Sequence, residues 1–235
     1  MRLVLVRHGQ TVSNTLHALD TAMPGAELDE EGLAQAEELA QNFERLVGGK
    51  PSVLYVSPLT RTQQTARPLA EKYGLEPIIR EGVREVIAGD IEMSTTPEDV
   101  RTYMRTFIAW VEGDLDVRMP GAQNGHETLA RTREVLDEAL SNARETIGED
   151  AIVVVVAHGA ISRVIASSLS ADIETELVSR YPMDNTGTTV LEWVGGDEPW
   201  FSDRSLWRAL TWSDKPIDAY ELTGERVEPV ESKVR

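Results

Sequence analysis

The sequence contains no cysteine among its 235 residues. Without thiols the chain forms no disulfide, has no cysteine nucleophile and offers no cysteine ligand to zinc, which excludes several enzyme classes. Its uninterrupted apolar stretches are short, and none reaches the length needed to span a bilayer. Because the N-terminus leads directly into a strand-like segment without a signal-peptide pattern, we expect a cytoplasmic protein.

Basic residues are scarce: 23 Lys and Arg stand against 40 Asp and Glu, which gives a formal net charge of -17. Nucleic acids and anionic membranes are bound mainly through clustered cations, so neither is expected as a partner. A chain of this length can bury a full core, and we expect a single domain over residues 1–235. Homodimers are common among soluble enzymes of this size, but the sequence leaves open whether this chain forms one.

Two apolar, β-branched runs each end in a histidine and a glycine. The runs are 3–6, followed by Arg7, His8 and Gly9, and 152–157, followed by His158 and Gly159. Such runs without polar alternation are typical of strands buried on both faces of a parallel sheet, and ligands bind at the carboxyl ends of such strands. Arg7 supplies a cationic fork suited to phosphate. The pattern therefore indicates phosphoryl chemistry.

These histidines have two other interpretations. A histidine at a strand end is commonly a hydrogen-bonded structural residue, but its repetition in a chain with only four histidines favours catalysis. As metal ligands the histidines are less suitable, because Arg7 disfavours a cation and no Asp or Glu lies close by in either motif. We therefore expect no metal and no other cofactor.

Strand-like and helix-like patterns alternate along the chain. Asp29 is the predicted N-cap of a helix that ends at Gly48, and a second helix opens at Ser57 and ends at Gly74. Further strands are expected over 53–56, 78–79, 190–194 and 206–212, and further helices over 97–112, 127–147 and 160–169. The alternation lapses over 86–125, which we interpret as a lid inserted over the site. The tail from Pro216 is weakly patterned and is expected to be a surface strap or partly disordered.

Four motifs together resemble the histidine phosphatase superfamily, which includes the phosphoglycerate mutase-like enzymes. The motifs are Arg7-His8-Gly9-Gln10-Thr11 with Asn14, Ser57-Pro58-Leu59-Thr60-Arg61-Thr62-Gln63-Gln64-Thr65, Arg84-Glu85 and Ala157-His158-Gly159. They occur in the family order over roughly the first two-thirds of the chain. The resemblance implies an α/β fold, a three-layer αβα sandwich with a mainly parallel central sheet and an inserted helical lid. It also implies a metal-independent phosphatase that forms a covalent phosphohistidine.

The resemblance further implies roles for single residues. His8 would be the nucleophile, Glu85 the general acid and base, and His158 a second catalytic histidine. The residues implied to bind the phosphoryl oxygens are Arg7, Asn14, Arg61 and His158. Taken singly, these residues have ordinary explanations. Arg61 fits a solvated helix start, Asn14 a cap, and Glu85 a charged surface patch that also contains Glu81.

The segment that follows Glu85 distinguishes between two activities. Phosphoglycerate mutases carry extra basic residues there that retain a bisphosphorylated intermediate, whereas residues 86–92 contain Asp90, Glu92 and no cation. Repulsion of a second phosphate favours a phosphomonoester hydrolase acting on a small phosphorylated metabolite. Mutase-type transfer, a phosphoprotein phosphatase and a non-catalytic phosphate-binding module remain alternatives. Substrate selection is expected to come from residues 16–26 and from the insertion.

Overall fold

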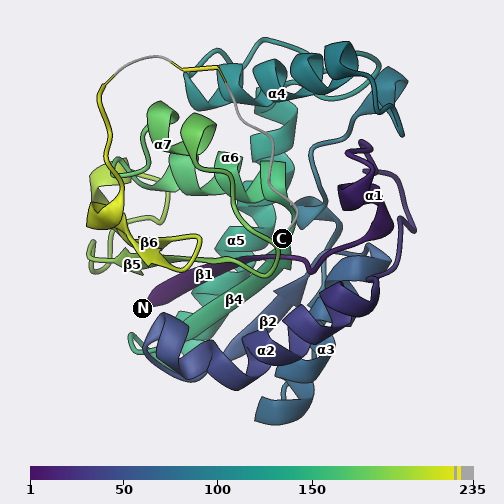
Figure 1. The fold of residues 1–235 in the computed structure, drawn as a ribbon. Coiled ribbons are helices and arrows are strands. Elements are labelled where there is room, and N and C mark those ends of the chain that lie inside the picture. Colours follow the sequence, from purple (N-terminus) through teal and green to yellow (C-terminus); the bar gives the residue numbers. More distant parts are fainter. Residues whose placement is uncertain (225–226, 229–235) are drawn as a thin grey trace.

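A computed structural model of the chain describes residues 1–224 and 227–228. Within these residues the chain forms one seven-stranded sheet with helices on both faces (Figure 1). In sheet order the strands are β3 (Ile78–Ile79), β2 (Val53–Val56), β4 (Ile152–Ala157), β1 (Arg2–Arg7), β5 (Thr188–Trp193), β6 (Trp207–Trp212) and β7 (Lys215–Pro216). The predicted three-layer α/β fold is confirmed.

Strand direction changes across this sheet. β1, β2, β3 and β4 run parallel, whereas β5, β6 and β7 are antiparallel to their neighbours. β1 pairs with β4 from Arg2 opposite Ile152 to Arg7 opposite Ala157, so the two strands end at the same edge. The residues that follow these ends, His8 and His158, are therefore neighbours although they are 150 positions apart in the sequence.

Each face of the sheet has its own hydrophobic core. In β1, Leu3 and Leu5 belong to one core and Val4 and Val6 to the other, because successive side chains of a strand point to opposite faces. Burial on both faces explains why the run lacks polar alternation. The core of Val4 is covered by α2 (Glu30–Val47) and α3 (Thr60–Tyr73). The core of Leu3 is covered by α4 (Pro97–Val111), α5 (Gly125–Thr146), α6 (Gly159–Leu169) and α7 (Thr175–Arg180). Shorter elements are α1 (Val12–Thr15), η1 (Glu81–Val83), η2 (Gly89–Ile91), η3 (Arg204–Leu206) and η4 (Ile217–Ala219).

Most helix ends coincide with the sequence signals. The Asp29 carboxylate accepts the Gly32 N–H at 2.8 Å as the cap of α2, and Gly48 ends this helix in the left-handed conformation with φ 77°. The helix predicted to open at Ser57 begins only at Thr60, because Leu59 is still extended with ψ 144°. Gly74 ends α3 as predicted, also in the left-handed conformation.

The segment over 86–125 contains η2 and α4, and α4 packs against α6 and α7. Phe107 of α4 is fully buried, and the Tyr103 hydroxyl donates a hydrogen bond of 2.8 Å to the Val86 carbonyl. The aromatic residues Tyr103, Phe107 and Trp110 are all buried and pack this segment against the core. That the segment acts as a lid stays a prediction.

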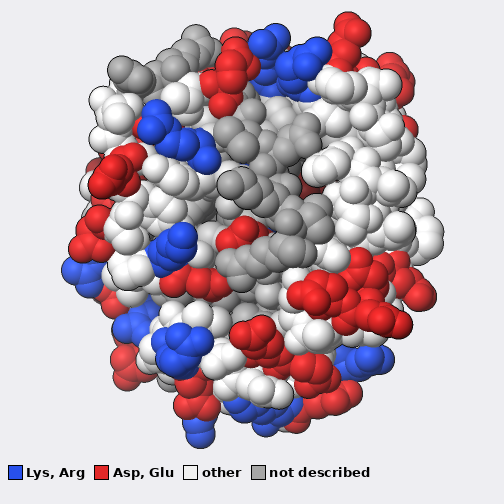
Figure 2. Space-filling model, in the orientation of Figure 1, with Lys and Arg blue, Asp and Glu red and all other residues white. Residues whose placement is uncertain are grey.

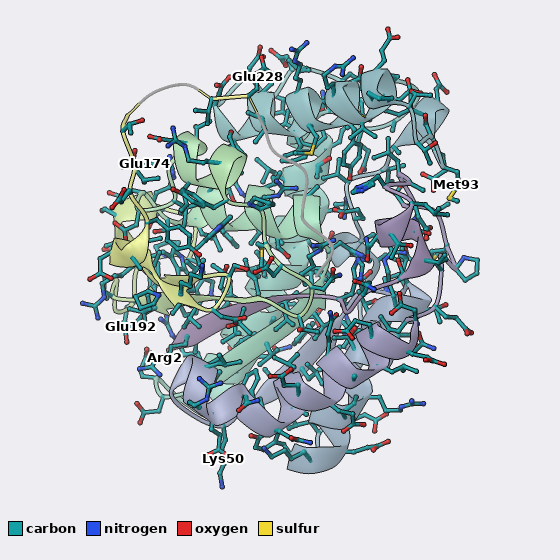
Figure 3. All side chains as sticks on the ribbon, in the orientation of Figure 1. Arg2, Lys50, Met93, Glu174, Glu192 and Glu228 are labelled. Atoms are coloured by element: carbon teal, nitrogen blue, oxygen red, sulfur yellow. The ribbon has the colours of Figure 1, made fainter. Side chains whose placement is uncertain are left out.

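The chain after β6 runs along the surface of the molecule. The Glu176 carboxylate of α7 accepts the backbone N–H groups of Thr223 and Gly224, the latter at 2.7 Å. Further along, Glu228, which Figure 3 labels, lies 3.2 Å from the guanidinium of Arg105 on α4. Up to Gly224 the tail therefore follows the course of the predicted strap, whereas residues 225–226 and 229–235 lie outside the described residues.

Acidic side chains are spread over the face drawn in Figure 2, with basic side chains between them. This distribution agrees with the net charge of -17 and with a charged surface rather than one acidic site. Among the residues that the structure describes, no helix is long and apolar enough to cross a membrane.

The loop that carries His8 lies against the start of α2 through two glycines. A Cβ atom on Gly32 would lie 2.1 Å from the Gln10 carbonyl oxygen, and one on Gly9 would lie 2.6 Å from the Gly32 carbonyl oxygen. Both obstructions are backbone atoms, which cannot rotate away as a side chain can. Because neither glycine has a side chain, the backbone of the His8 loop can lie directly against the start of α2, and this contact fixes the loop.

We predict that Gly32→Ala lowers the free energy of unfolding by about 2–3 kcal/mol, although alanine favours helices, because it separates the two backbones. Phosphatase activity should fall with it. Gly74→Ala is the control, since a Cβ there meets no atom within 4 Å and the residue has φ +65°. It should cost about 1–2 kcal/mol and leave activity intact. Chemical denaturation and an activity assay on both variants measure the difference, and equal effects on activity would contradict the role of Gly32.

Candidate active site

The two histidines meet at the carboxyl ends of β1 and β4. Their ring centroids are 5.3 Å apart, with the planes inclined at 64°. His8 is 4% exposed and borders a pocket, whereas His158 is fully buried behind it and does not border the open volume.

His8 presents a defined ring nitrogen to the pocket. Its Nδ1 lies 2.7 Å from the Gly9 carbonyl oxygen, which can only accept, so Nδ1 carries the proton and donates it. The other nitrogen, Nε2, then has the lone pair. Burial, together with the charges of Arg61 and Arg7, holds the pKa of His8 well below its usual value. The imidazole is therefore neutral at neutral pH.

His158 is hydrogen-bonded to Ser57, the residue that directly follows β2. Its Nε2 lies 2.7 Å from the Ser57 hydroxyl, while Nδ1 is buried and has no hydrogen-bond partner among the described residues. Burial and the charge of Arg61 lower the pKa of His158 well below its usual value as well. This ring also remains neutral, and Nδ1 is its unused polar atom.

Two arginines lie beside the histidines. Arg7 donates to the Met183 carbonyl at 2.8 Å, and Arg61 donates to the Asp20 carbonyl at 2.7 Å. Both side chains are buried, and within the described residues no group accepts a hydrogen bond from either Nε or from Nη1 of Arg61. Burial, with Arg163 nearby, lowers the pKa of Arg7 to about 10, so the guanidinium stays charged at neutral pH. Unsatisfied buried donors of this kind indicate a site for an anionic ligand.

Asn14 lines the same pocket and is also part of a helix cap. Its side-chain oxygen accepts the Thr11 N–H at 3.1 Å and the Asn185 amide at 3.3 Å. Both sequence interpretations of Asn14 are therefore compatible, since the cap occupies the oxygen and leaves the amide nitrogen for a ligand.

Glu85 lies opposite, at the start of α6. Its carboxylate accepts three backbone N–H groups, those of Val86 at 2.8 Å, Ala160 at 3.1 Å and Ile161 at 2.8 Å. The last two belong to the first turn of α6. Glu85 is 9% exposed and lines the pocket, whereas the Glu81 side chain is 64% exposed and pairs with Arg84. The structure thus distinguishes Glu85, which lines the pocket, from Glu81, which does not.

Arg131 of α5 fixes the backbone of the loop that carries Glu85. Its guanidinium donates to the carbonyls of Gly82 at 2.6 Å, Arg84 at 2.9 Å and Glu85 at 3.0 Å. Its Nε donates to the Gln123 side chain at 3.0 Å. Four hydrogen bonds from one rigid group leave this loop little freedom.

Asp90 and Glu92, the acidic residues that follow Glu85, do not point into the pocket, where they would meet a second phosphate directly. Neither Asp90 nor Glu92 borders the pocket. The Glu92 carboxylate instead accepts the backbone N–H groups of Thr21 at 2.7 Å and Ala22 at 2.8 Å, and the Thr21 hydroxyl as well. Glu92 therefore fixes the wall over 16–26, and its charge also acts on Arg61 of the pocket. That the two acidic residues repel a second phosphate stays a prediction.

Residues distant in the sequence complete the pocket, which has a volume of about 130 Å³. From the two regions expected to select the substrate come His17, Ala18, Leu19, Asp20, Thr21, Val100, Tyr103 and Met104. Sequence reasoning missed Arg163 and Asn185, which also line the pocket, and Ser57 as the partner of His158. Arg163 lies on the helix predicted over 160–169, directly after His158, and this nearness to a candidate site residue could have identified it. Asn185 gave no signal.

Metal ligands do not cluster in the part of the chain that the structure describes. No group of three or more His, Asp or Glu side chains there could hold a metal ion. The charges that act on His8 are those of Arg61 and Arg7, whose guanidinium groups suit an anion.

Comparisons with known proteins agree with this geometry. A sequence model of the histidine phosphatase superfamily (branch 1) matches residues 3–202. The PE-PGRS family protein PE_PGRS11 of Mycobacterium tuberculosis is 31% identical over 233 residues, which are 92% of this chain and 37% of that protein. Phosphoserine phosphatase 1 of Hydrogenobacter thermophilus is 30% identical over 138 residues, 59% of this chain and 64% of that protein. The chain thus spans less than two thirds of each of these two relatives.

Solved structures show the same fold. Mycobacterial glucosyl-3-phosphoglycerate phosphatase matches with a TM-score of 0.69 and 26% identity, over 91% of this chain and 99% of that one. The family match covers most of the chain and includes all four motifs found in the sequence. The chain therefore belongs to branch 1 of the histidine phosphatase superfamily.

Proposed function

We propose that the protein is a phosphomonoester hydrolase that acts through a covalent phosphohistidine on His8. The observation that carries this proposal is the placement of His8, a buried imidazole that borders the pocket and whose Nδ1 lies 2.7 Å from the Gly9 carbonyl oxygen. Its Nε2 lone pair is the available nucleophile, and Arg7 and Arg61 lie beside it with unsatisfied donors.

In the first step, Nε2 of His8 attacks the phosphorus atom and the bond from phosphorus to the leaving oxygen breaks. Arg7, Arg61, Asn14 and His158 donate hydrogen bonds to the phosphoryl oxygens and stabilise the charge of a loose transition state. Glu85, in its protonated form, gives its proton to the leaving oxygen. The products of this step are phosphohistidine and a free alcohol.

In the second step, water attacks the phosphorus atom and the bond to Nε2 of His8 breaks. Glu85, now a carboxylate, accepts a proton from the water, which regenerates the acid for the next cycle. The Arg131 contacts support this assignment, because a group that must reach both an alcohol and a water needs a fixed position.

Small phosphorylated metabolites are the proposed substrates. Two matched proteins are named for such substrates, phosphoserine in one and glucosyl-3-phosphoglycerate in the other. A pocket of about 130 Å³ is smaller than the roughly 300–1,000 Å³ typical of drug-sized ligands and suits a compact ester. A cytoplasmic location, a homodimer and a lid over 86–125 belong to the same proposal.

The roles of His8 and Glu85 predict different dependence on the leaving group. His8→Ala should abolish turnover of every substrate, and no phosphoenzyme should be trapped. In Glu85→Gln, phosphorylation of the enzyme by alkyl phosphates should be about 100-fold or more slower. Phosphorylation by an aryl phosphate should be only mildly slower, because a phenolate leaving group needs little protonation. Rapid-quench kinetics should then detect phosphohistidine accumulating with the aryl substrate. Glu81→Gln is the matched control. Equal losses on both substrates without a trapped intermediate would contradict the role of Glu85.

Activity on an aryl phosphate should survive prolonged treatment with EDTA. Guanidinium groups supply the positive charge around the phosphoryl group in the proposed mechanism, so a divalent ion has no step to perform. The measurement is the kcat/KM before and after chelation and after addition of magnesium, manganese or zinc. Activity that disappears with EDTA and returns with one of these ions would refute the mechanism.

The lowered pKa of His8 predicts activity on the acidic side of neutrality. An ordinary imidazole is half protonated near pH 6.5, whereas His8 should keep its lone pair well below that value. The burst rate of phosphoenzyme formation with an aryl phosphate should therefore stay level as the pH falls through about 6.5. The variant Arg61→Met lacks one of the charges that lower the pKa of His8, and it should form phosphoenzyme more slowly. The pH at which its burst rate falls on the acidic side should be higher than in the wild type. A wild-type burst that halves at about pH 6.5 would contradict this account.

A further inference from the structure

Arg163 is a third arginine of the pocket, and the proposed phosphoryl transfer does not use it. It lies on α6 and is 4% exposed, and it lines the same pocket as Arg7 and Arg61. Arg61 pairs with Asp20 at 3.6 Å, but Arg163 forms no ion pair among the described residues. A buried charge without a paired partner is unfavourable unless a ligand supplies one.

The contacts of Arg163 leave part of its guanidinium unused. Nε donates to the Gly159 carbonyl at 3.1 Å, Nη1 lies 3.5 Å from the Val178 carbonyl, and the guanidinium carbon lies 4.6 Å from the Phe107 ring centroid. These hydrogen bonds go to neutral acceptors and use two of the five N–H donors. Burial lowers the pKa of Arg163 to about 10, so it remains a cation at neutral pH.

Arg163 lies on the helix whose first turn binds Glu85, the proposed proton donor to the leaving oxygen. Glu85, which would protonate the leaving oxygen, binds the N–H groups of Ala160 and Ile161 on the same helix, and its negative charge acts on Arg163. The adjacent wall comes from Tyr103 and its neighbours on α4. A group attached to the leaving oxygen would therefore enter the space between Glu85, Arg163 and α4.

We propose that Arg163 binds a carboxylate on the leaving group, so that the enzyme selects phosphomonoesters of small hydroxy acids. This proposal rests on the proposed function. A planar carboxylate matches the planar guanidinium fork, and it adds little volume in a pocket of about 130 Å³. The carboxylate would also give Arg163 a direct ion pair, which Glu85 does not form with it although its charge acts on Arg163.

The test compares substrates that differ in one carboxylate: 3-phosphoglycerate with glycerol 3-phosphate, and O-phosphoserine with O-phosphoethanolamine. The wild-type kcat/KM should be about 30-fold or more higher for the carboxylate-bearing member of each pair. In Arg163→Gln this ratio should fall to within about 3-fold of one, and Arg163→Lys should keep an intermediate ratio, because it retains the charge without the fork.

Arg144→Gln is the matched control. Arg144 of α5 also lies over an aromatic ring, 3.8 Å from the Trp200 centroid, and donates to a carbonyl, that of Gly196 at 2.8 Å, away from the pocket. This variant should preserve the wild-type ratio. Circular dichroism and thermal unfolding of all variants establish that they fold, and Arg163→Lys carries the test if the glutamine variant does not.

Two results would overturn the subsite. One is a wild-type enzyme that hydrolyses both members of each pair equally well. The other is an equal loss on both members in Arg163→Gln, which would make Arg163 a support for Glu85. Calorimetric binding of the same pairs to His8→Ala tests the subsite without turnover. There, a preference for the carboxylate supports the proposal and its absence refutes it, even if the wild type hydrolyses nothing and the proposed function fails.

Discussion

Two imidazoles remain uncharged because they are enclosed together with permanently charged guanidinium groups, and the organisation of the site depends on this constraint. Desolvation and the neighbouring arginines both act against protonation of His8 and His158. The parallel pairing of β1 with β4 makes the enclosure possible, since it brings the two rings to one sheet edge. The Gly9 carbonyl orients the His8 ring and the Ser57 hydroxyl orients the His158 ring, so that each ring has one nitrogen left for a ligand.

The charge distribution of the molecule follows from the same arrangement. A chain with a net charge of -17 repels an anionic substrate at long range, but that repulsion is screened within about 8–10 Å at physiological ionic strength. The arginines of the pocket are buried, where screening is weak and hydrogen bonds to a phosphoryl group are strong. Short-range contacts of these few cations therefore outweigh the acidic surface once a ligand enters.

Local signals in the sequence were sufficient for most of the fold. The buried runs before His8 and His158 predicted parallel strands, and Asp29, Gly48 and Gly74 predicted helix ends, because these effects act over a few residues. Asn185 was not predictable, since its value lies in contacts with His8 and Asn14, more than 170 positions away. Arg131 was missed for the same reason. Its guanidinium looks like an ordinary helix charge until the loop over 82–85 folds against it.

The division of the pocket into two sets of elements has an evolutionary consequence. The residues proposed to bind the phosphoryl group come from the ends of β1 and β4, from α1 and from the start of α3. The rest of the pocket wall comes largely from α4 and the segment over 16–26. Substitutions on α4 can therefore accumulate without altering the protonation of the histidines. A gene for such a chain can acquire new substrates by drift in one helix while its reaction chemistry is preserved.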